Sequence, residues 1–426
     1  MKPATPADTA QAAPGPTPGA SAMPPRPQRP DTPDYIPAHL VFNFDIHGDA
    51  RIGQDVQGDY ARVLASAPDL FWTPANGGHW VAKGFDVITA IVTDPTHFSV
   101  REMQIPRVEN PPFFIPLSLD PPENLPYRRA MAPMFCPTAV NTLEPGMREW
   151  ARRIVDGVAP RGACDFQADI AKIYPVTVFM ELMGMDLARL HEFRHLAEGF
   201  FASQNDAAEI ARLSSQILGT LKQLVDEKRA HPDDKLMSHF VHADMGGRTM
   251  TDDEILAMSF VLFLGGMDTV TNVTGFAFQQ LATMPDVQAI LAADPSRIAD
   301  FADEAVRLFG VVNTPRLVVQ DVQLGDAPLR AGEMLLCVLC CGSRDPAKFD
   351  APNAFQLGRK RAAHLTFSSG PHLCIGHVLG RAEIRILTEE WFKRIGAFSA
   401  TAGVAHATRM GTVMALENLP LEWAVA

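Results

Sequence analysis

The chain has 426 residues, of which 47% are apolar, and a formal net charge of −12. This composition supports a large buried core, whereas the acidic balance argues against nucleic acid as a main partner, because neutralising phosphates needs an excess of lysine and arginine. Its six cysteines have no regular spacing, which is typical of a reducing compartment, so we expect a cytoplasmic protein with free thiols.

The amino-terminal residues differ in composition from the rest. Residues 1–33 hold many prolines and few large apolar side chains, so they cannot offset the entropy of ordering, and we expect a disordered arm. They contain no apolar run that could form a secretory signal. Residues 34–426 have the composition of a single domain, without a later linker or repeat. Apolar runs such as 260–264 are far shorter than the roughly 20 residues that span a bilayer, which predicts no membrane helix.

Elements predicted along this domain are mostly helical. A capping box at Thr251, with Glu254 as its partner, predicts a helix over 251–283 that is apolar on nearly every face and therefore buried on all sides. Further helices are predicted over 297–308 and from just after Cys374 to about Trp391. Strand patterns are fewer. They cover residues 79–81, 316–322 and 333–340, and a carboxy-terminal hairpin near Val413 and Leu421. The pattern predicts a mainly α fold with a minor β part.

The segment 367–376, Phe-Ser-Ser-Gly-Pro-His-Leu-Cys-Ile-Gly, is the strongest chemical signal. A cysteine just before a helix faces unpaired backbone N–H groups and the positive helix end, which stabilise a thiolate for metal ligation or nucleophilic attack. Glycines at Gly370 and Gly376 allow tight turns and the close approach of a flat partner, while Phe367 can shield the sulfur. For Cys374 alone, an inert buried cysteine is the alternative.

This spacing, Phe-x-x-Gly-x-His-x-Cys-x-Gly, resembles the haem-binding loop of cytochromes P450. Such a match arises by chance on the order of once in ten thousand. The resemblance extends from about Tyr35 to the end of the chain and implies the fold of that family, with haem b between the long central helix and the helix after the cysteine. It implies that Cys374 is the axial metal ligand and that Phe367, His372 and Gly376 help to bind the cofactor. Ser368 stands where the family usually has glycine.

The run Gly265-Gly266-Met267-Asp268-Thr269 breaks the rules of a buried helix. Two glycines cost roughly 2 kcal/mol of helix propensity, and a buried acid costs more unless it is used. A close helix crossing with Asp268 in a salt bridge is one interpretation. The pattern also resembles the oxygen-activation segment of the family, which implies that Asp268 and Thr269 are catalytic and relay protons during dioxygen activation.

Other matching positions carry cofactor or structural roles by the same resemblance. Glu304 and Arg307 lie three residues apart on one predicted helix, and with Arg359 they would lock the cysteine loop. Arg128, Arg316 and His372 fall where the family places partners of the haem propionates, which suits charge-assisted hydrogen bonds. Asn124 stands where many members have histidine.

A Cys-x-x-Cys pattern at Cys337 and Cys340, followed by Cys341, could suggest a metal or redox site. No second cysteine pair accompanies it. The flanking side chains are apolar, so we interpret these cysteines as small hydrophobic residues of a buried strand.

Substrate expectations follow from a likeness to the bacterial camphor hydroxylase group. Its camphor-binding tyrosine would fall near Pro112, which has no hydroxyl, so camphor itself is not expected. The matching pocket positions are mostly apolar. They are Gln104, Pro112, Leu117, Val261, Leu264, Gly265, Val312, Thr314 and Val413. We expect hydroxylation of a small hydrophobic molecule, a terpenoid or norisoprenoid such as an ionone.

The resemblance also implies electron delivery by a small partner. Basic residues matching the cysteine side of the family are Arg128, Arg129, Arg359, Lys360 and Arg361. Such a patch suits an acidic [2Fe-2S] ferredoxin with its NADH-dependent reductase. The alternatives are a peroxygenase or a haem-thiolate protein that binds ligands without catalysis. Asp268 and Thr269 favour the monooxygenase, since only dioxygen activation needs a proton relay.

Overall fold

A computed structural model describes residues 31–109, 113–202, 206–360 and 363–425. The helices of this part are α1 Val56–Leu64, α2 Phe85–Val92, α3 Leu125–Phe135, α4 Pro137–Val158, α5 Tyr174–Met183, α6 Leu190–Ala202, α7 Ala207–Ala230, α8 Leu236–His242, α9 Asp252–Leu281, α10 Pro285–Ala293, α11 Ile298–Leu308, α12 Leu339–Gly342 and α13 His377–Arg394. A π-helical turn, Gln167–Ala171, precedes α5. Helix dominates, as expected.

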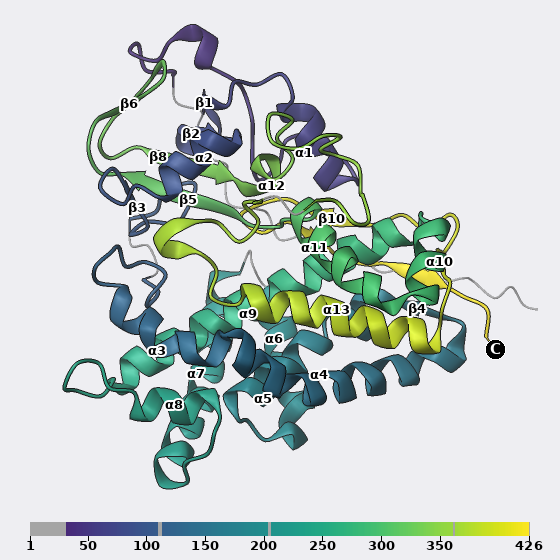
Figure 1. Ribbon diagram of the computed structural model, residues 1–426. Coiled ribbons are helices and arrows are strands. Elements are labelled where there is room, and N and C mark those ends of the chain that lie inside the picture. The colour runs from purple at the N-terminus through teal and green to yellow at the C-terminus, as the bar shows by residue number, and fades with distance from the viewer. Residues whose placement is uncertain (1–30, 110–112, 203–205, 361–362, 426) are drawn as a thin grey trace, which may run out of the picture.

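The strands form small sheets. They are β1 Leu70–Thr73, β2 His79–Ala82, β3 Phe98–Ser99, β4 Ala163–Asp165, β5 Asn313–Val318, β6 Val322–Leu324, β7 Ala327–Leu329, β8 Met334–Val338, β9 Ser399–Ala400, β10 Thr408–Arg409, β11 Ala415–Leu416 and β12 Pro420–Glu422. The largest is a five-stranded sheet in the order β1-β2-β8-β5-β3. Side chains from one set of its strand positions, such as Trp72, Trp80 and Leu335, form a smaller core with those of α2, whereas Phe71, Val81 and Leu336 belong to the larger core that the helices share. Figure 1 shows this sheet region at one end of the molecule, above the helices.

Helix α9 is the central element of the helical part. Its capping box is formed as expected: the Thr251 hydroxyl accepts a hydrogen bond from the Glu254 N–H, and the Glu254 carboxylate accepts one from the Thr251 N–H. The helix packs against α5, α7, α8, α11 and α13. It is long and apolar enough to cross a membrane by length and composition alone, but a central helix packed among others has the same properties.

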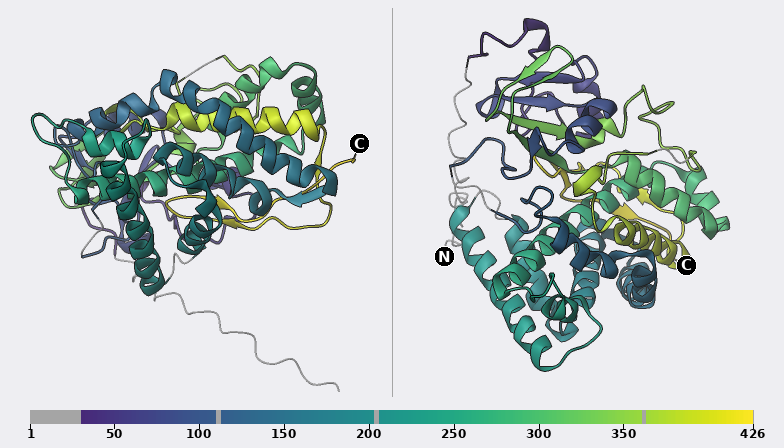
Figure 2. Two further views of the ribbon diagram at one scale, coloured as in Figure 1. Left: turned by 90° about the horizontal axis from the view of Figure 1, so that it is seen from below. Right: turned by 60° about the vertical axis from the view of Figure 1, so that its left-hand side comes forward.

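Helix α13 brings the cysteine loop to this centre. It lies along α4 and α11, and it also contacts α9. Figures 1 and 2 show α13 beside α4, with the loop that precedes α13 turned toward the sheet region. Cys374 therefore lies where the sheet region and the helical region meet.

Several predicted elements differ from the observed ones. The strand predicted over 316–322 ends at Val318, and the chain turns before β6. The strand predicted over 333–340 ends at Val338, where α12 begins. The predicted terminal hairpin is confirmed near Val413, which lies in the segment between the antiparallel strands β10 and β11 and also forms a bridge with Val312. Leu421 does not belong to this hairpin: it lies in β12, which pairs with β4 and β9. The predicted arm lies almost wholly outside the described residues, so the division at residue 34 stays a prediction.

Candidate active site

The loop before α13 has a backbone that only small residues fit well. Gly370 adopts a φ of 66°, and a Cβ there would lie 3.0 Å from the Thr93 Cγ2 and 3.1 Å from the Val92 carbonyl oxygen. Ser368 adopts a φ of 59°, a left-handed conformation that costs a side-chain-bearing residue free energy and explains why glycine suits this position. The Cys374 N–H then donates to the Phe367 carbonyl oxygen at 2.9 Å, which closes the loop.

The Cys374 side chain is solvent accessible. Burial among protein atoms nevertheless raises the pKa of its thiol, and the Gly376 N–H and the charges of Arg128 and Arg381 only partly oppose this effect. A sulfur in this position needs a cation as partner before it ionises. A Cβ at Gly376 would meet only the Cys374 sulfur, at 3.9 Å, so this glycine leaves space beside the sulfur for a flat group.

Three basic side chains, Arg128, Arg316 and His372, are brought together at the cysteine loop, because both arginines lower the pKa of His372. Arg316 is buried, and its Nη1 donates to the Thr314 hydroxyl and the Pro315 carbonyl oxygen, both at 2.8 Å. Arg128 donates to the Leu373 carbonyl oxygen at 2.5 Å. Burial, followed by the charges of Arg316 and Arg128, lowers the pKa of His372 to about 4. Neither arginine has a carboxylate within 4.0 Å in the described part of the chain, so a ligand with carboxylates would satisfy them.

Two polar side chains of this site, Asn124 and His372, have buried atoms without a hydrogen-bond partner among the described residues. Asn124 is fully buried at the start of α3, and neither its Nδ2 nor its Oδ1 has a partner among the described residues. The His372 Nε2 is likewise buried without one. Buried polar atoms without partners are costly. A flat macrocycle that carries two carboxylates and an iron atom, as haem does, fits this set of sulfur, cations and unpartnered donors.

Helix α9, which contacts α13, leaves open space beside Gly265 and Gly266, and we call this space the Gly265 opening. Gly265 is exposed although its helix runs through the middle of the fold, and a Cβ at Gly265 or Gly266 would meet no atom within 4 Å. The two glycines therefore do not mark a close helix crossing, and the expectation that the helix is buried on all sides is wrong at this point. The Thr269 hydroxyl donates to the Gly265 carbonyl oxygen at 2.5 Å, so its oxygen lies at the opening.

Asp268 lies on α9 between this opening and a polar surface network. Its carboxylate accepts a hydrogen bond of 2.9 Å from the Asn272 amide. Burial raises the pKa of Asp268, whereas Arg409 and the Asn272 hydrogen bond lower it. Arg409 in turn bonds Glu417 at 3.1 Å, and both side chains are partly exposed. Asp268 is thus linked electrostatically to groups that reach solvent.

A buried ion cluster fixes the segment that leads to the cysteine loop. Glu304 binds Arg307 through two hydrogen bonds of 2.8 Å and binds the Nε of Arg359 at 2.9 Å. The arginines also donate to main-chain oxygens, those of Ser343 and Pro352 from Arg307 and those of Asp350 and Ala354 from Arg359. The expected grouping of these ionic residues is thus present.

We expect Glu304→Gln to lower the free energy of unfolding by about 3–5 kcal/mol, because it leaves two buried guanidinium groups without a countercharge. Urea unfolding followed by circular dichroism measures this change. The matched control is Glu149→Gln on α4, whose exposed carboxylate binds Arg152 and Arg153 and should affect stability much less, because solvent screens an exposed ion pair. Equal effects of the two substitutions would contradict a structural role for Glu304.

The structure adds a residue that the sequence patterns did not single out. Arg381 lies 4.5 Å over the ring of Phe367, binds Asp303 at 3.1 Å and donates to His364 Nε2, also at 3.1 Å. Arg381, Asp303 and His364 line a surface cavity of about 520 Å³ on the side of α13. The sequence could have indicated Arg381 by its position, because Arg381 lies on the helix that was predicted to follow Cys374 directly.

The predicted pocket positions fall on several segments. Val312, Thr314 and Val413 are brought together because residues 311–314 and 411–414 run side by side. Val261, Leu264 and Gly265 share one face of α9. Gln104 and Leu117 lie on the segment between β3 and α3, half-buried and exposed respectively. Their joint role in binding substrate stays a prediction, and Pro112 lies outside the described residues.

Two expectations about other side chains change. Arg359 cannot belong to an exposed basic patch, because its side chain is only 10% exposed and is held by Glu304. Arg361 lies outside the described residues. Cys337 and Cys340 are buried as expected, although Cys340 and Cys341 belong to α12 and not to a strand. Within the described ranges, no three potential metal ligands of the His, Cys, Asp or Glu type are gathered.

Comparison with known proteins is consistent with this geometry. A family model described as Cytochrome P450 matches residues 179–394. The chain is 29% identical to a probable cytochrome P450 127A1 of Sinorhizobium fredii, over 92% of this chain and 97% of the relative. It is 30% identical to the cytochrome P450 monooxygenase PikC of Streptomyces venezuelae, over 87% of this chain and 93% of that protein.

Solved structures give the same result. The crystal structure of CYP101J2 superposes with a TM-score of 0.85 and 32% sequence identity, over 93% of this chain and all of that one. The crystal structure of the cytochrome P450 CYP101C1 gives a TM-score of 0.86 and 30% identity, over 92% of this chain and all of that one.

Proposed function

The chain belongs to the cytochrome P450 family and is therefore a haem-dependent oxidoreductase. From this premise we propose that it hydroxylates a small hydrophobic terpenoid or norisoprenoid such as an ionone. We propose that a [2Fe-2S] ferredoxin supplies the electrons. The observation that carries the proposal is the open space beside Gly265 on α9, the helix that contacts α13. The Thr269 hydroxyl lies next to this space, because it donates to the Gly265 carbonyl oxygen.

Apolar side chains around this opening favour a compact hydrophobic substrate. Val261 and Leu264 on α9 and the bridged pair Val312 and Val413 present branched hydrocarbon groups, which bind a hydrocarbon skeleton by excluding water. Relatives carry names as different as mycinamicin IV hydroxylase/epoxidase and vitamin D(3) 25-hydroxylase. The substrate class therefore rests on this chain's own side chains.

When bound, haem supplies the reductive activation of dioxygen and the oxidation of an unactivated C–H bond. The chain's residues bind and tune it. Cys374 would ligate the iron as a thiolate, while Arg128, Arg316 and His372 would hold the propionate carboxylates. Asn124, whose buried amide has no partner among the described residues, would donate a hydrogen bond where the resemblance implies histidine in other members.

Proton delivery is assigned to two residues of α9. The Thr269 hydroxyl can release its hydrogen bond to the Gly265 carbonyl oxygen and hold a water molecule at the opening. Asp268 can take up a proton near neutral pH more readily than a free carboxyl, because burial raises its pKa. Arg409 and Glu417 connect it to solvent, so the carboxyl can be reprotonated after each transfer.

A substrate screen tests the proposed chemistry most directly. We would titrate terpenoids and norisoprenoids into the ferric protein and follow the visible spectrum, in which displacement of the iron-bound water shifts the Soret band. Compounds that shift the band are then tested for NADH-dependent hydroxylation with a ferredoxin and its reductase. Failure of every compact apolar compound, together with a response to larger polar ones, would contradict the substrate class.

Ferredoxin docking should depend on the exposed basic side chains Arg129 and Lys360. We expect Lys360→Ala to slow second-order reduction by ferredoxin about three- to tenfold at low salt, with the difference shrinking as salt screens the charges. Stopped-flow reduction at several ionic strengths measures this. Arg212→Ala, which removes an exposed arginine of α7, is the matched control. Equal rates for parent and Lys360→Ala at every ionic strength would remove Lys360 from the interface.

A further inference from the structure

The exposed face of α6 carries a motif that oxygen chemistry does not use. Residues 191–195 have the sequence His-Glu-Phe-Arg-His, which is the pattern H-E-x-x-H, and they lie wholly within α6. On an α-helix, residues four apart lie one turn apart on the same face, with Cβ atoms roughly 5–6 Å from each other. Phe193 is buried, whereas His191 and His195 are both exposed. The helix therefore turns both imidazole rings toward solvent.

Both rings are free to act as ligands. Neither His191 nor His195 forms a hydrogen bond or ion pair with another residue in the described part of the molecule. The histidines of α8 differ: His239 bonds the Ala130 carbonyl oxygen at 2.7 Å, and His242 bonds the Ser238 carbonyl oxygen at 2.8 Å. Two free imidazoles one helical turn apart form a bidentate set of nitrogen donors.

We propose that His191 and His195 bind one divalent transition-metal ion, of the Zn²⁺, Ni²⁺ or Cu²⁺ type, on the surface of α6. Neutral imidazole nitrogens suit these ions, and a pair of histidines at this helical spacing is a known arrangement for zinc. In the described structure no third potential ligand of the His, Cys, Asp or Glu type is gathered with them, so water completes the coordination. Glu198, the next carboxylate on this face, is bound by Arg194 at 2.6 Å.

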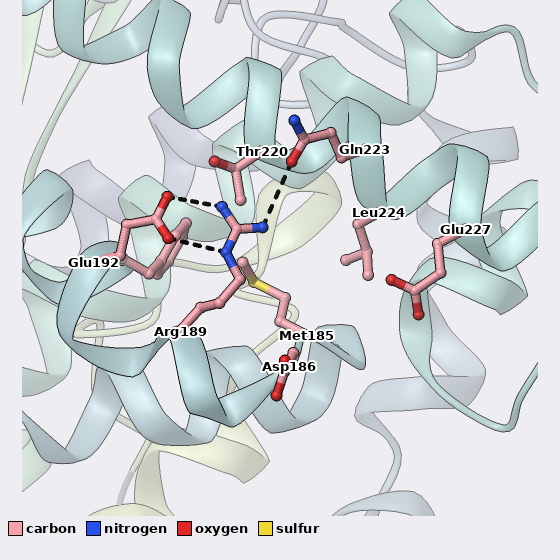
Figure 3. Close-up of a pocket in the computed structure, with 9 residues that line it drawn as sticks. Met185, Asp186, Arg189, Glu192, Thr220, Gln223, Leu224 and Glu227 are labelled. Atoms are coloured by element: carbon pink, nitrogen blue, oxygen red, sulfur yellow. Dashed lines mark hydrogen bonds and ion pairs between the residues drawn. The ribbon is translucent and has the colours of Figure 1, made fainter.

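The glutamate of the motif, Glu192, argues against a hydrolytic site. The Glu192 carboxylate accepts hydrogen bonds of 2.9 Å and 2.7 Å from Arg189, whose guanidinium also reaches Gln223 of α7 at 3.5 Å. Figure 3 shows these contacts at a pocket of about 180 Å³ between α6 and α7. A carboxylate neutralised by an arginine is a poor general base. The site is therefore a metal-binding site and not the centre of a peptidase.

Calorimetric titration of the untagged, chelator-treated holoenzyme with Zn²⁺ or Ni²⁺ alone tests the proposal. The parent should bind one ion per chain, and His191→Ala or His195→Ala should weaken that binding at least about tenfold, since each removes one of two protein ligands. Both positions are exposed on a helix, where alanine is well tolerated, and unchanged haem spectra verify folding. His231→Ala removes an exposed histidine elsewhere and should change nothing.

One further variant and a thermal measurement sharpen the outcome. Glu192→Gln should bind the ion as the parent does, because Glu192 is not a ligand, and Zn²⁺ should raise the melting temperature of the parent but not of His195→Ala. The proposal is overturned if the parent binds no ion, if His195→Ala binds it as tightly as the parent, or if Glu192→Gln loses it as fully as the histidine variants. These results are independent of hydroxylase activity.

Discussion

Replacing Cys374 by alanine is expected to abolish monooxygenation and to remove the red-shifted Soret band of the reduced carbon monoxide complex. Among the described residues, this sulfur lies within the influence of Arg128 and Arg381 and beside the open face of Gly376. Activity should fall by more than about a hundredfold, the upper range seen when a residue that merely supports a metal ligand is lost.

Difference spectra and haem content measure this prediction together. Cys136→Ala is the matched control, because Cys136 is a half-buried cysteine whose thiol donates only to the Pro133 carbonyl oxygen. That variant should keep haem, the band and activity. A Cys374→Ala protein that retained the band would show that another residue ligates the iron.

Local patterns in the sequence predicted the parts of the fold that depend on neighbouring residues. The capping box at Thr251 is such a case, since all of its hydrogen bonds lie within one turn. The spacing around Cys374 is another, because Gly370 adopts a positive φ that glycine tolerates best. Ser368 also has a positive φ, which explains why glycine is usual at this position and leaves the serine without a local explanation.

Contacts between distant segments were less accessible from sequence. The bridge of Val413 to Val312 joins residues about a hundred positions apart, and no turn signal near Val413 specifies that partner. The Arg381 contacts with Phe367 and His364 and the approach of Arg409 to Asp268 likewise depend on tertiary packing. The end of β8 at Val338 was missed because an apolar run does not distinguish a strand from a helical turn.

The burial of Glu304 shows how position changes the meaning of a local pair. A glutamate and an arginine three residues apart usually form an exposed pair of small effect. Here both side chains are only 3% exposed, and Arg359 completes the cluster from a segment that sequence proximity does not reveal. Only the resemblance to a family supplied that third member before the structure did.

Substitutions at Thr269 and Asp268 should change how oxygen is used while substrate affinity stays nearly the same. Thr269→Ala removes the only hydroxyl that the structure places at the Gly265 opening in the described part of α9, so electrons should still be consumed but should form hydrogen peroxide in place of product. Asp268→Asn removes the ionisable group that connects this opening to Arg409 and Glu417, and turnover should fall by about a hundredfold.

Parallel measurements of NADH consumption, peroxide, hydroxylated product and substrate dissociation constant separate these effects. Thr271→Ala is the matched control, because its hydroxyl donates to the Ala171 carbonyl oxygen on a buried side of the same helix and should affect stability more than coupling. Slow turnover with intact coupling is expected for Asp268→Asn, since proton supply then limits every cycle, whereas fast turnover with poor coupling is expected for Thr269→Ala. If both variants convert NADH to product as efficiently as the parent does, these side chains serve the packing of α9 and not proton delivery.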